Sequence, residues 1–161
     1  MKLFLKIALA AVAAAFLSCS KDEAVEQAGL NVTPSNLEGC WQLSEWMGEA
    51  LPEGNFVYME LTRQDKKFTI YENMRGTSTV TCRYSGTYGI SDGNVIKGIY
   101  DNSIYTYWAH DYEVSDLTGD RMVWTATDNP EDVSVYVRVD SIPGNISGEA
   151  LPGNDEKTEN R

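Results

Sequence analysis

The chain has 161 residues, of which 24 are acidic and 13 are basic, giving a formal net charge of −11. This length allows one ordinary domain and is too short for two well-packed cores. The acidity argues against a nucleic-acid partner, because surfaces that bind nucleic acid carry basic groups that neutralise phosphates. It also disfavours direct contact of the protein body with an anionic membrane surface.

Residues 1–18 have the pattern of a secretory signal peptide. Lys2 and Lys6 form a short positive leader, Ile7–Leu17 is an unbroken run of apolar and small residues, and the small Ser18 follows it. The run is too short to cross a bilayer core, which requires about 20 helical residues. A buried N-terminal helix would show polar residues at helical spacing, and the run has none. We therefore expect this segment to be a cleaved signal.

Cys19 directly follows the apolar run. The sequence Phe16-Leu17-Ser18-Cys19 resembles a bacterial lipoprotein signal, in the form that is typical of Bacteroidota. The resemblance implies that Cys19 is lipidated and becomes the mature N-terminus. Each buried methylene contributes ~0.8 kcal/mol, and two or more acyl chains anchor a protein stably. We expect the lipid on Cys19 to be the membrane contact of the protein.

The residues after Cys19 predict a location. Ser20–Glu23, SKDE, resembles the acidic, lysine-containing export tag of lipoproteins on the outer face of the outer membrane. We expect display on the cell surface, with the periplasmic face of the outer membrane as the alternative. Residues 19–36 are polar, and we expect a flexible tether with at most a short helix over Asp22–Ala28.

Cys40 and Cys82 remain if Cys19 carries the lipid. In an oxidising compartment such a pair can form a disulfide. A bond closing a loop of about 40 residues would stabilise the fold by roughly 4 kcal/mol in the chain-entropy model. Two buried thiols are the alternative, because cysteine is common in protein cores.

From Glu38 the chain shows short runs of β-branched and aromatic residues separated by Gly, Asn and Asp. Ser91–Asn94 and Thr118–Asp120 are turn signals, since Gly and Asn accept the positive φ that tight hairpins require. The predicted strands are 39–46, 56–61, 67–72, 79–84, 86–90, 95–100, 104–113, 121–127 and 133–140.

Two-residue alternation indicates how these strands pack. Every second residue from 133 to 139 is valine, with Ser134, Tyr136 and Arg138 between them. This alternation is typical of an antiparallel sheet with one solvated face. No helical period interrupts the series, so a parallel sheet with crossover helices is excluded. The chain is therefore all-β, and an up-and-down barrel and a sandwich are the two candidate architectures.

The barrel is favoured by a resemblance to lipocalins. The Gly39-x-Trp41 pattern on the first strand, with Arg138 on the last, is similar to the lipocalin pattern. The phrases FTIYE, YSGTYGI and GIYDNSIYTYWAHDYEV resemble small lipocalin-like lipoproteins of Bacteroidota. The resemblance covers about residues 37–143. It implies an antiparallel up-and-down (meander) barrel of about eight strands, closed at one end by Trp41 with Arg138 packed on its ring.

The chain after Ile142 is rich in Gly, Pro and acidic residues, and residues 144–161 are expected to be a disordered acidic tail. Asp140–Ile142, DSI, resembles the O-glycosylation acceptor of Bacteroides proteins, which makes Ser141 a candidate for carrying sugar.

His110 is the only histidine and is followed by Asp111 and Glu113. Strand alternation places it on the opposite face from both acids, so the three side chains cannot converge. A metal site would need distant carboxylates that sequence cannot place. We expect a surface or hairpin-end histidine, no metal and no cofactor. Because no nucleophile elbow, phosphate loop or His-Glu-x-x-His motif is present, we also expect no enzymatic activity, with an enzyme built on His110 as the alternative.

Aromatic residues are the best candidates for a binding site. Nine tyrosines and four tryptophans are present, and their rings combine an apolar face with a polar tip. The candidate ligand-binding residues are Tyr84, Tyr88, Tyr105 and Trp108. Cross-strand packing is the alternative role for each ring, and an eight-stranded barrel can be filled by its own side chains.

Together these features predict an outer-membrane lipoprotein whose barrel is a non-catalytic binding module for a small apolar or amphipathic ligand. The alternative is a surface interaction or structural module with a filled barrel, such as an inhibitor or an accessory subunit of an uptake complex.

Overall fold

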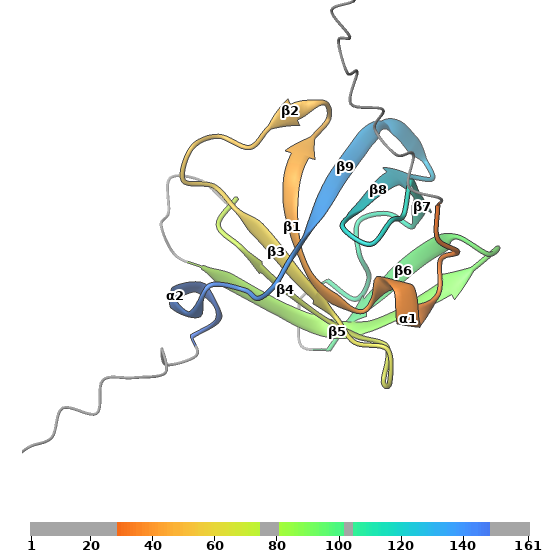
Figure 1. Ribbon diagram of the computed structural model, residues 1–161, viewed down its shortest axis with the longest axis horizontal. Coiled ribbons are helices and arrows are strands. Elements are labelled where there is room, and N and C mark those ends of the chain that lie inside the picture. Colours follow the sequence, from red (N-terminus) through yellow and green to blue (C-terminus); the bar gives the residue numbers. More distant parts are fainter. Residues whose placement is uncertain (1–28, 75–80, 102–104, 149–161) are drawn as a thin grey trace, which may run out of the picture.

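The computed structural model describes residues 29–74, 81–101 and 105–148 (Figure 1). The predicted signal, Cys19, the export tag and the expected tether up to residue 28 lie outside the described residues, as does the tail beyond Gly148. The described elements are α1 (Pro34–Leu37), β1 (Gly39–Trp46), β2 (Glu49–Ala50), β3 (Val57–Leu61), β4 (Lys67–Glu72), β5 (Cys82–Ser91), β6 (Val95–Tyr100), β7 (Tyr112–Ser115), β8 (Arg121–Ala126), β9 (Asn129–Val139) and α2 (Gly144–Ser147).

The strands form one closed antiparallel barrel. Each strand from β3 to β8 pairs with the next one along the chain, and β1 pairs with both β3 and β9. β1 and β9 lie side by side in Figure 1, where the first and last strands meet. β2 is an additional short strand that pairs only with the end of β1. The predicted all-β, up-and-down barrel of eight strands is confirmed.

Most predicted strands match the structure to within a few residues, and two predictions need correction. The sequence predicts separate strands at 79–84 and 86–90, but residues 82–91 form one strand, β5. The strand continues through Gly86, which pairs regularly with Phe68 on one side and Tyr100 on the other. The part of 79–84 before residue 81 lies outside the described residues.

The strand predicted at 104–113 is the second prediction that needs correction. Only Tyr112–Ser115 forms β7, and Tyr107 contributes an isolated bridge to Ile99. The backbone at 108–111 is irregular, and the indole of Trp108 lies directly on Gly98, where a Cβ atom would collide with the ring.

One end of the barrel, which we call the closed end, contains the start of β1 and α1. Helix α1 begins after Thr33, whose side chain accepts a hydrogen bond from the amide of Asn36 and caps the helix. It places Leu37 over the barrel interior, where its side chain is fully buried. The largest fully buried side chains are Trp41, Phe68, Leu37, Met59, Leu61, Ile96, Leu117, Met122 and Val114. Full burial of each aliphatic one contributes ~1.5–3 kcal/mol.

The structure brings Trp41 and Arg138 together at the closed end. The guanidinium carbon of Arg138 lies 4.1 Å from the centre of the Trp41 ring. Arg138 also donates hydrogen bonds to the carbonyls of Gly119, Glu38 (2.6 Å) and Asn36 (3.1 Å). Gly39 adopts a φ of 133°, and a Cβ atom there would collide with Arg138 Nη1. The glycine of the Gly-x-Trp pattern is therefore required both by its backbone and by the arginine above it.

The predicted disulfide between Cys40 and Cys82 is wrong, since the structure forms no bond between these two residues. Cys40 lies on β1 and Cys82 begins β5, with β3 and β4 between them. Three steps of ~4.8 Å between strands separate the two positions by about 14 Å across the sheet, and Cys82 lies three residues further along β5 from the position level with Cys40. A disulfide requires Cα atoms within about 7 Å.

Both predicted flexible segments have ordered parts next to the barrel. The amide of Leu30 donates a 2.7 Å hydrogen bond to the carbonyl of Leu117, and α1 begins at Pro34, inside the expected tether. At the other end Gly144–Ser147 forms α2, ended by Gly148 in the left-handed conformation, so an irregular tail does not begin at residue 144. Of the residues described, no helix is long and apolar enough to span a membrane.

Candidate functional site

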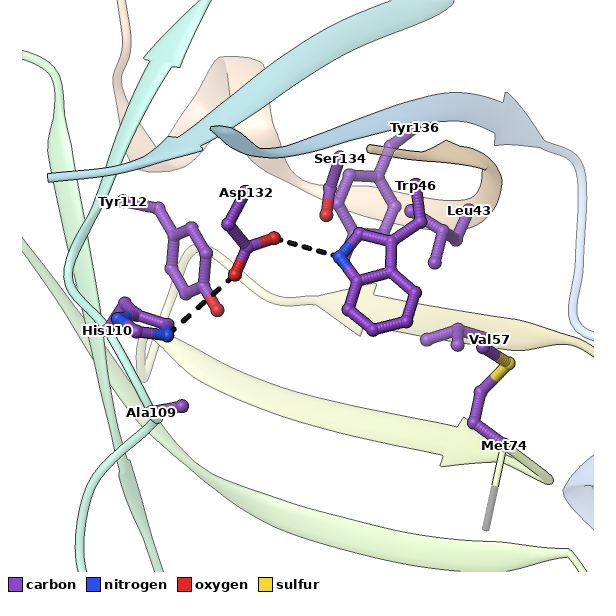
Figure 2. A pocket seen from close by; sticks show the side chains of 10 residues that line it. All are labelled: Leu43, Trp46, Val57, Met74, Ala109, His110, Tyr112, Asp132, Ser134 and Tyr136. Atoms are coloured by element: carbon purple, nitrogen blue, oxygen red, sulfur yellow. Dashed lines mark hydrogen bonds and ion pairs between the residues drawn. The ribbon is translucent and has the colours of Figure 1, made fainter. Parts of the chain in front are cut away.

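The other end of the barrel, which we call the open end, contains a cavity of about 370 Å³. We name it the outer cavity, and Figure 2 shows its lining. The side chains come from β1, β3, β7 and β9 and from the segments after β4 and before β7: Leu43, Trp46, Val57, Met74, Ala109, His110, Tyr112, Asp132, Ser134 and Tyr136.

A second space of about 160 Å³ continues from the outer cavity, and we name it the inner cavity. The two share Ala109, Tyr112, Ser134 and Tyr136. The remaining lining of the inner cavity is mainly apolar and aromatic: Met59, Ile70, Tyr100, Trp108 and Trp124. Because Tyr112 and Tyr136 border both spaces, the two cavities together form one hollow, with the smaller aromatic chamber at its inner end.

The rings around the inner cavity support one another. Trp124 lies 5.4 Å from Trp108, 5.6 Å from Tyr112 and 5.1 Å from Tyr136, measured between ring centres. Phe68 extends this cluster toward the closed end, at 4.9 Å from Trp108. Aromatic pairs at such distances add about 0.5–1.5 kcal/mol each beyond simple burial, so the rings stabilise the wall of the inner cavity.

A cluster of one histidine and two aspartates lies at the mouth of the outer cavity. His110 Nδ1 is 2.6 Å from Asp128 Oδ1, and His110 Nε2 is 3.7 Å from Asp132 Oδ2. Trp46 Nε1 donates a 2.8 Å hydrogen bond to Asp132 Oδ1. Figure 2 shows Asp132 between the imidazole and the indole. The cluster connects the segment before β7 to the β8–β9 turn and to the end of β1.

His110, which the sequence predicts at the surface or at a hairpin end, lies in the segment before β7. Its side chain is 27% exposed and lines the outer cavity. Its partners are not its sequence neighbours, and Asp111 instead pairs with Lys97 at 3.9 Å. The β7–β8 register, with Tyr112 opposite Ala126, places His110 near Asp128 when continued by two residues. Sequence alone carries no signal for that register.

Burial keeps the tyrosine hydroxyls of the site neutral. Burial raises the pKa of Tyr112 to about 12, with smaller contributions from Asp132, Tyr100 and Asp128. Burial also raises the pKa of Tyr136, again with Tyr112 and Asp132 acting in the same direction. At neutral pH both phenols are therefore protonated and can donate or accept hydrogen bonds.

The four aromatic residues predicted from sequence occupy different places. Trp108 lines the inner cavity. Tyr84 contacts Tyr100 at 5.8 Å between ring centres but lines neither cavity. Tyr105 is half exposed and also lines neither cavity.

Tyr88 is buried in the barrel core, away from both cavities. Its hydroxyl donates a 3.1 Å hydrogen bond to the carbonyl of Thr62 beyond the end of β3. Burial, with a smaller contribution from Glu38, raises its pKa to about 12. Tyr88 is therefore a packing residue of the barrel.

Ser141, the candidate glycosylation residue, is exposed just after β9. It borders a small space on the outside of the barrel together with Cys40, Glu60 and Tyr71. Among the residues described, no three His, Cys, Asp or Glu side chains are arranged to hold a metal ion.

Comparison with known proteins identifies the class to which this barrel belongs. A sequence model of the lipocalin-like domain matches residues 37–124, more than half of the chain. The chain is a member of the lipocalin-like domain family.

A crystal structure of a lipocalin-like protein from Bacteroides uniformis is similar to this chain, with 16% identity and a TM-score of 0.48. The similarity covers 65% of this chain and 99% of the other. No curated protein matches the chain.

Proposed function

We propose that the protein is a non-catalytic binding module that takes a small apolar or amphipathic ligand into the open end of its barrel. The observation that carries this proposal is the hollow of about 370 Å³ that continues into an inner space of about 160 Å³. Ligand sites are usually largely preformed apolar hollows with a few converging polar groups. The alternative of a filled barrel acting as an interaction surface does not account for this hollow.

The lining of the hollow supports an amphipathic ligand. Asp132 and His110 line only the outer cavity, whereas Met59 and Trp108 line only the inner cavity. A ligand with an apolar body and a polar head would therefore enter body first. Burial of the body would drive binding at roughly 25 cal/mol per Å² of apolar surface, less the entropy of immobilisation.

The proposal that the module is non-catalytic is supported by the environment of His110. Both ring nitrogens face carboxylates, at 2.6 Å for Asp128 and 3.7 Å for Asp132. A general base in nucleophilic catalysis instead directs one nitrogen at a hydroxyl or thiol. We expect His110→Ala to leave any hydrolytic activity of the preparation unchanged, and a specific loss of such activity would contradict this proposal.

We further propose that the barrel is displayed on the outer membrane through a lipid on Cys19. The support is the signal-like sequence before Cys19 and the tag that follows it. Mass spectrometry of the mature N-terminus should find a diacyl or triacyl modification on Cys19. A mature chain beginning elsewhere would contradict the anchor, and protection from protease on intact cells would favour the periplasmic face.

The binding proposal is tested with N-phenyl-1-naphthylamine, a neutral apolar dye whose fluorescence rises in apolar surroundings. We expect saturable binding to the purified protein and loss of binding in Ala109→Phe. Ala109 lines both cavities but is solvent-exposed, so a larger side chain there fills the hollow without disturbing the core. The control is Thr87→Phe on the exposed face of β5. Equal dye binding by the two variants would contradict the proposal.

A further inference from the structure

The charged lining of the two cavities is acidic. Among the described residues that line the two cavities, the formally charged side chain is Asp132, and neither lysine nor arginine is present. Asp128 faces the same imidazole from the β8–β9 turn. Two carboxylates share one histidine, so the cluster is negative whether or not His110 carries a proton.

Asp132 has an unused hydrogen-bonding capacity that faces the hollow. Its side chain is only 15% exposed, and Oδ1 accepts one hydrogen bond from Trp46 Nε1. Its Oδ2 atom is 3.7 Å from His110 Nε2, which is too long for a hydrogen bond. A carboxylate can accept about four hydrogen bonds, and a desolvated one is costly unless it is paired.

Aromatic rings line both cavities. Tyr112 and Tyr136 border both cavities, and Tyr100, Trp108 and Trp124 line the inner one. The face of an aromatic ring is electron-rich and attracts a cation, most strongly where water is excluded. The negative potential of Asp132 also contributes to raising the pKa of Tyr112, after burial, and the same potential stabilises a positive charge placed there.

From these three features we infer that the ligand is a protonated organic amine with an apolar body. Its ammonium group donates to Asp132 Oδ2 in the outer cavity, beside the rings of Tyr112 and Tyr136. Its body enters the inner cavity toward Trp108 and Met59. This inference rests on the proposed function and adds the chemical class of the head group. Anionic amphiphiles are disfavoured, because their head would meet Asp132 without any basic lining residue among those described.

Three probes that share one phenyl body test the head group: 2-phenylethylammonium, 2-phenylethanol and 3-phenylpropionate. Titration of the purified protein at neutral pH and physiological salt, followed by NMR, detects even weak binding. We expect the ammonium to bind about tenfold more tightly than the alcohol, because hydrogen bonds to charged groups are the stronger class. The carboxylate should bind more weakly than the alcohol.

Two matched variants locate the effect. Asp132→Asn removes the charge next to the hollow and keeps the side-chain shape, so the ammonium should lose its advantage over the alcohol. Asp128→Asn removes one negative charge from the same cluster, but Asp128 is 66% exposed and lines neither cavity. This control should retain most of the preference. If the ammonium were attracted only by the overall negative charge of the protein, both substitutions would reduce its advantage over the alcohol by the same amount. That result would overturn the inference.

The comparison of probes on the unmodified protein does not depend on how either variant folds. Equal binding of ammonium and alcohol, or tighter binding of the carboxylate, would overturn the ammonium head while leaving the binding module intact. Failure of all three probes, with the neutral naphthylamine dye still binding, would also overturn it. Failure of the dye as well would be failure of the proposed function itself.

Discussion

The two ends of this barrel are built from the same strands and differ in how they are filled. At the closed end Trp41, Leu61 and Phe68 are at most 1% exposed, and α1 covers them with Leu37. At the open end Leu43 and Tyr136 retain 7% and 9% exposure beside a hollow of about 370 Å³. The closed end is thus fully packed, whereas the open end keeps a hollow. Binding sites commonly depend on such a division between a rigid scaffold and an underfilled region.

Two tryptophans on the same strand provide the sharpest test of this comparison. Trp41→Ala should reduce the free energy of unfolding by about 3–5 kcal/mol, because it empties the closed end and removes the ring beneath Arg138. Trp46→Ala should cost about 1 kcal/mol, since Trp46 is 45% exposed at the open end. Urea unfolding measures both. Equal losses would contradict the division between the two ends.

Arg138 tests how the closed end is held. Arg138→Ala should destabilise the protein by about 2 kcal/mol, because it removes the cation–π contact and hydrogen bonds to backbone carbonyls. The control is Arg121→Ala on β8, whose exposed ion pair with Asp116 measures 3.4 Å. Such pairs contribute little, so we expect a loss below about 0.5 kcal/mol. The account of barrel closure fails if both variants lose the same small amount.

The open end should also respond to alkaline pH. The folded-state pKa of Tyr112 is raised to about 12 from the ordinary value of 10.0. Protonated Tyr112 therefore contributes stability that is fully present below pH 10 and is lost as the pH rises to 12. Tyr112→Phe should remove part of this loss, about 1 kcal/mol after allowing for partial exposure. Measuring the free energy of unfolding from pH 9 to 12 gives, for each protein, the slope of stability against pH.

The exposed Tyr107→Phe is the control for this alkaline experiment, since Tyr107 is 66% exposed. It should retain the slope of the unmodified protein. Identical slopes in all three proteins would contradict the burial of the Tyr112 hydroxyl.

The sequence predicted the closed end better than the open end, for a physical reason. Strand alternation and turn residues are local, so they identified β1, β4 and β6 at their exact bounds. The meeting of Trp41 with Arg138 followed from a recurring family pattern with one residue on the first strand and one on the last. Its glycine is explained by the structure, because Gly39 leaves room for Arg138.

The residues of the open end depend on strand register and on irregular backbone. His110 meets Asp128 because of how β7 pairs with β8, and no local pattern encodes that register. Trp108 was a candidate as an aromatic residue of an expected strand, but it reaches the cavity from irregular backbone packed on Gly98. The disulfide failed for a related reason, because pairing order, not cysteine count, placed two strands between Cys40 and Cys82.

The central claim, that one end of the barrel is hollow and receptive while the other is solid, is tested most directly by locating a bound probe. Intermolecular NOEs should be measured between N-phenyl-1-naphthylamine and the methyl groups of the ¹³C-labelled protein. We predict NOEs to Leu43, Val57 and Met59, which line the two cavities, and none to Leu37 or Leu61 at the closed end. NOEs confined to exposed residues such as Leu30 and Ile99 would contradict the account, because they would place the probe outside the barrel.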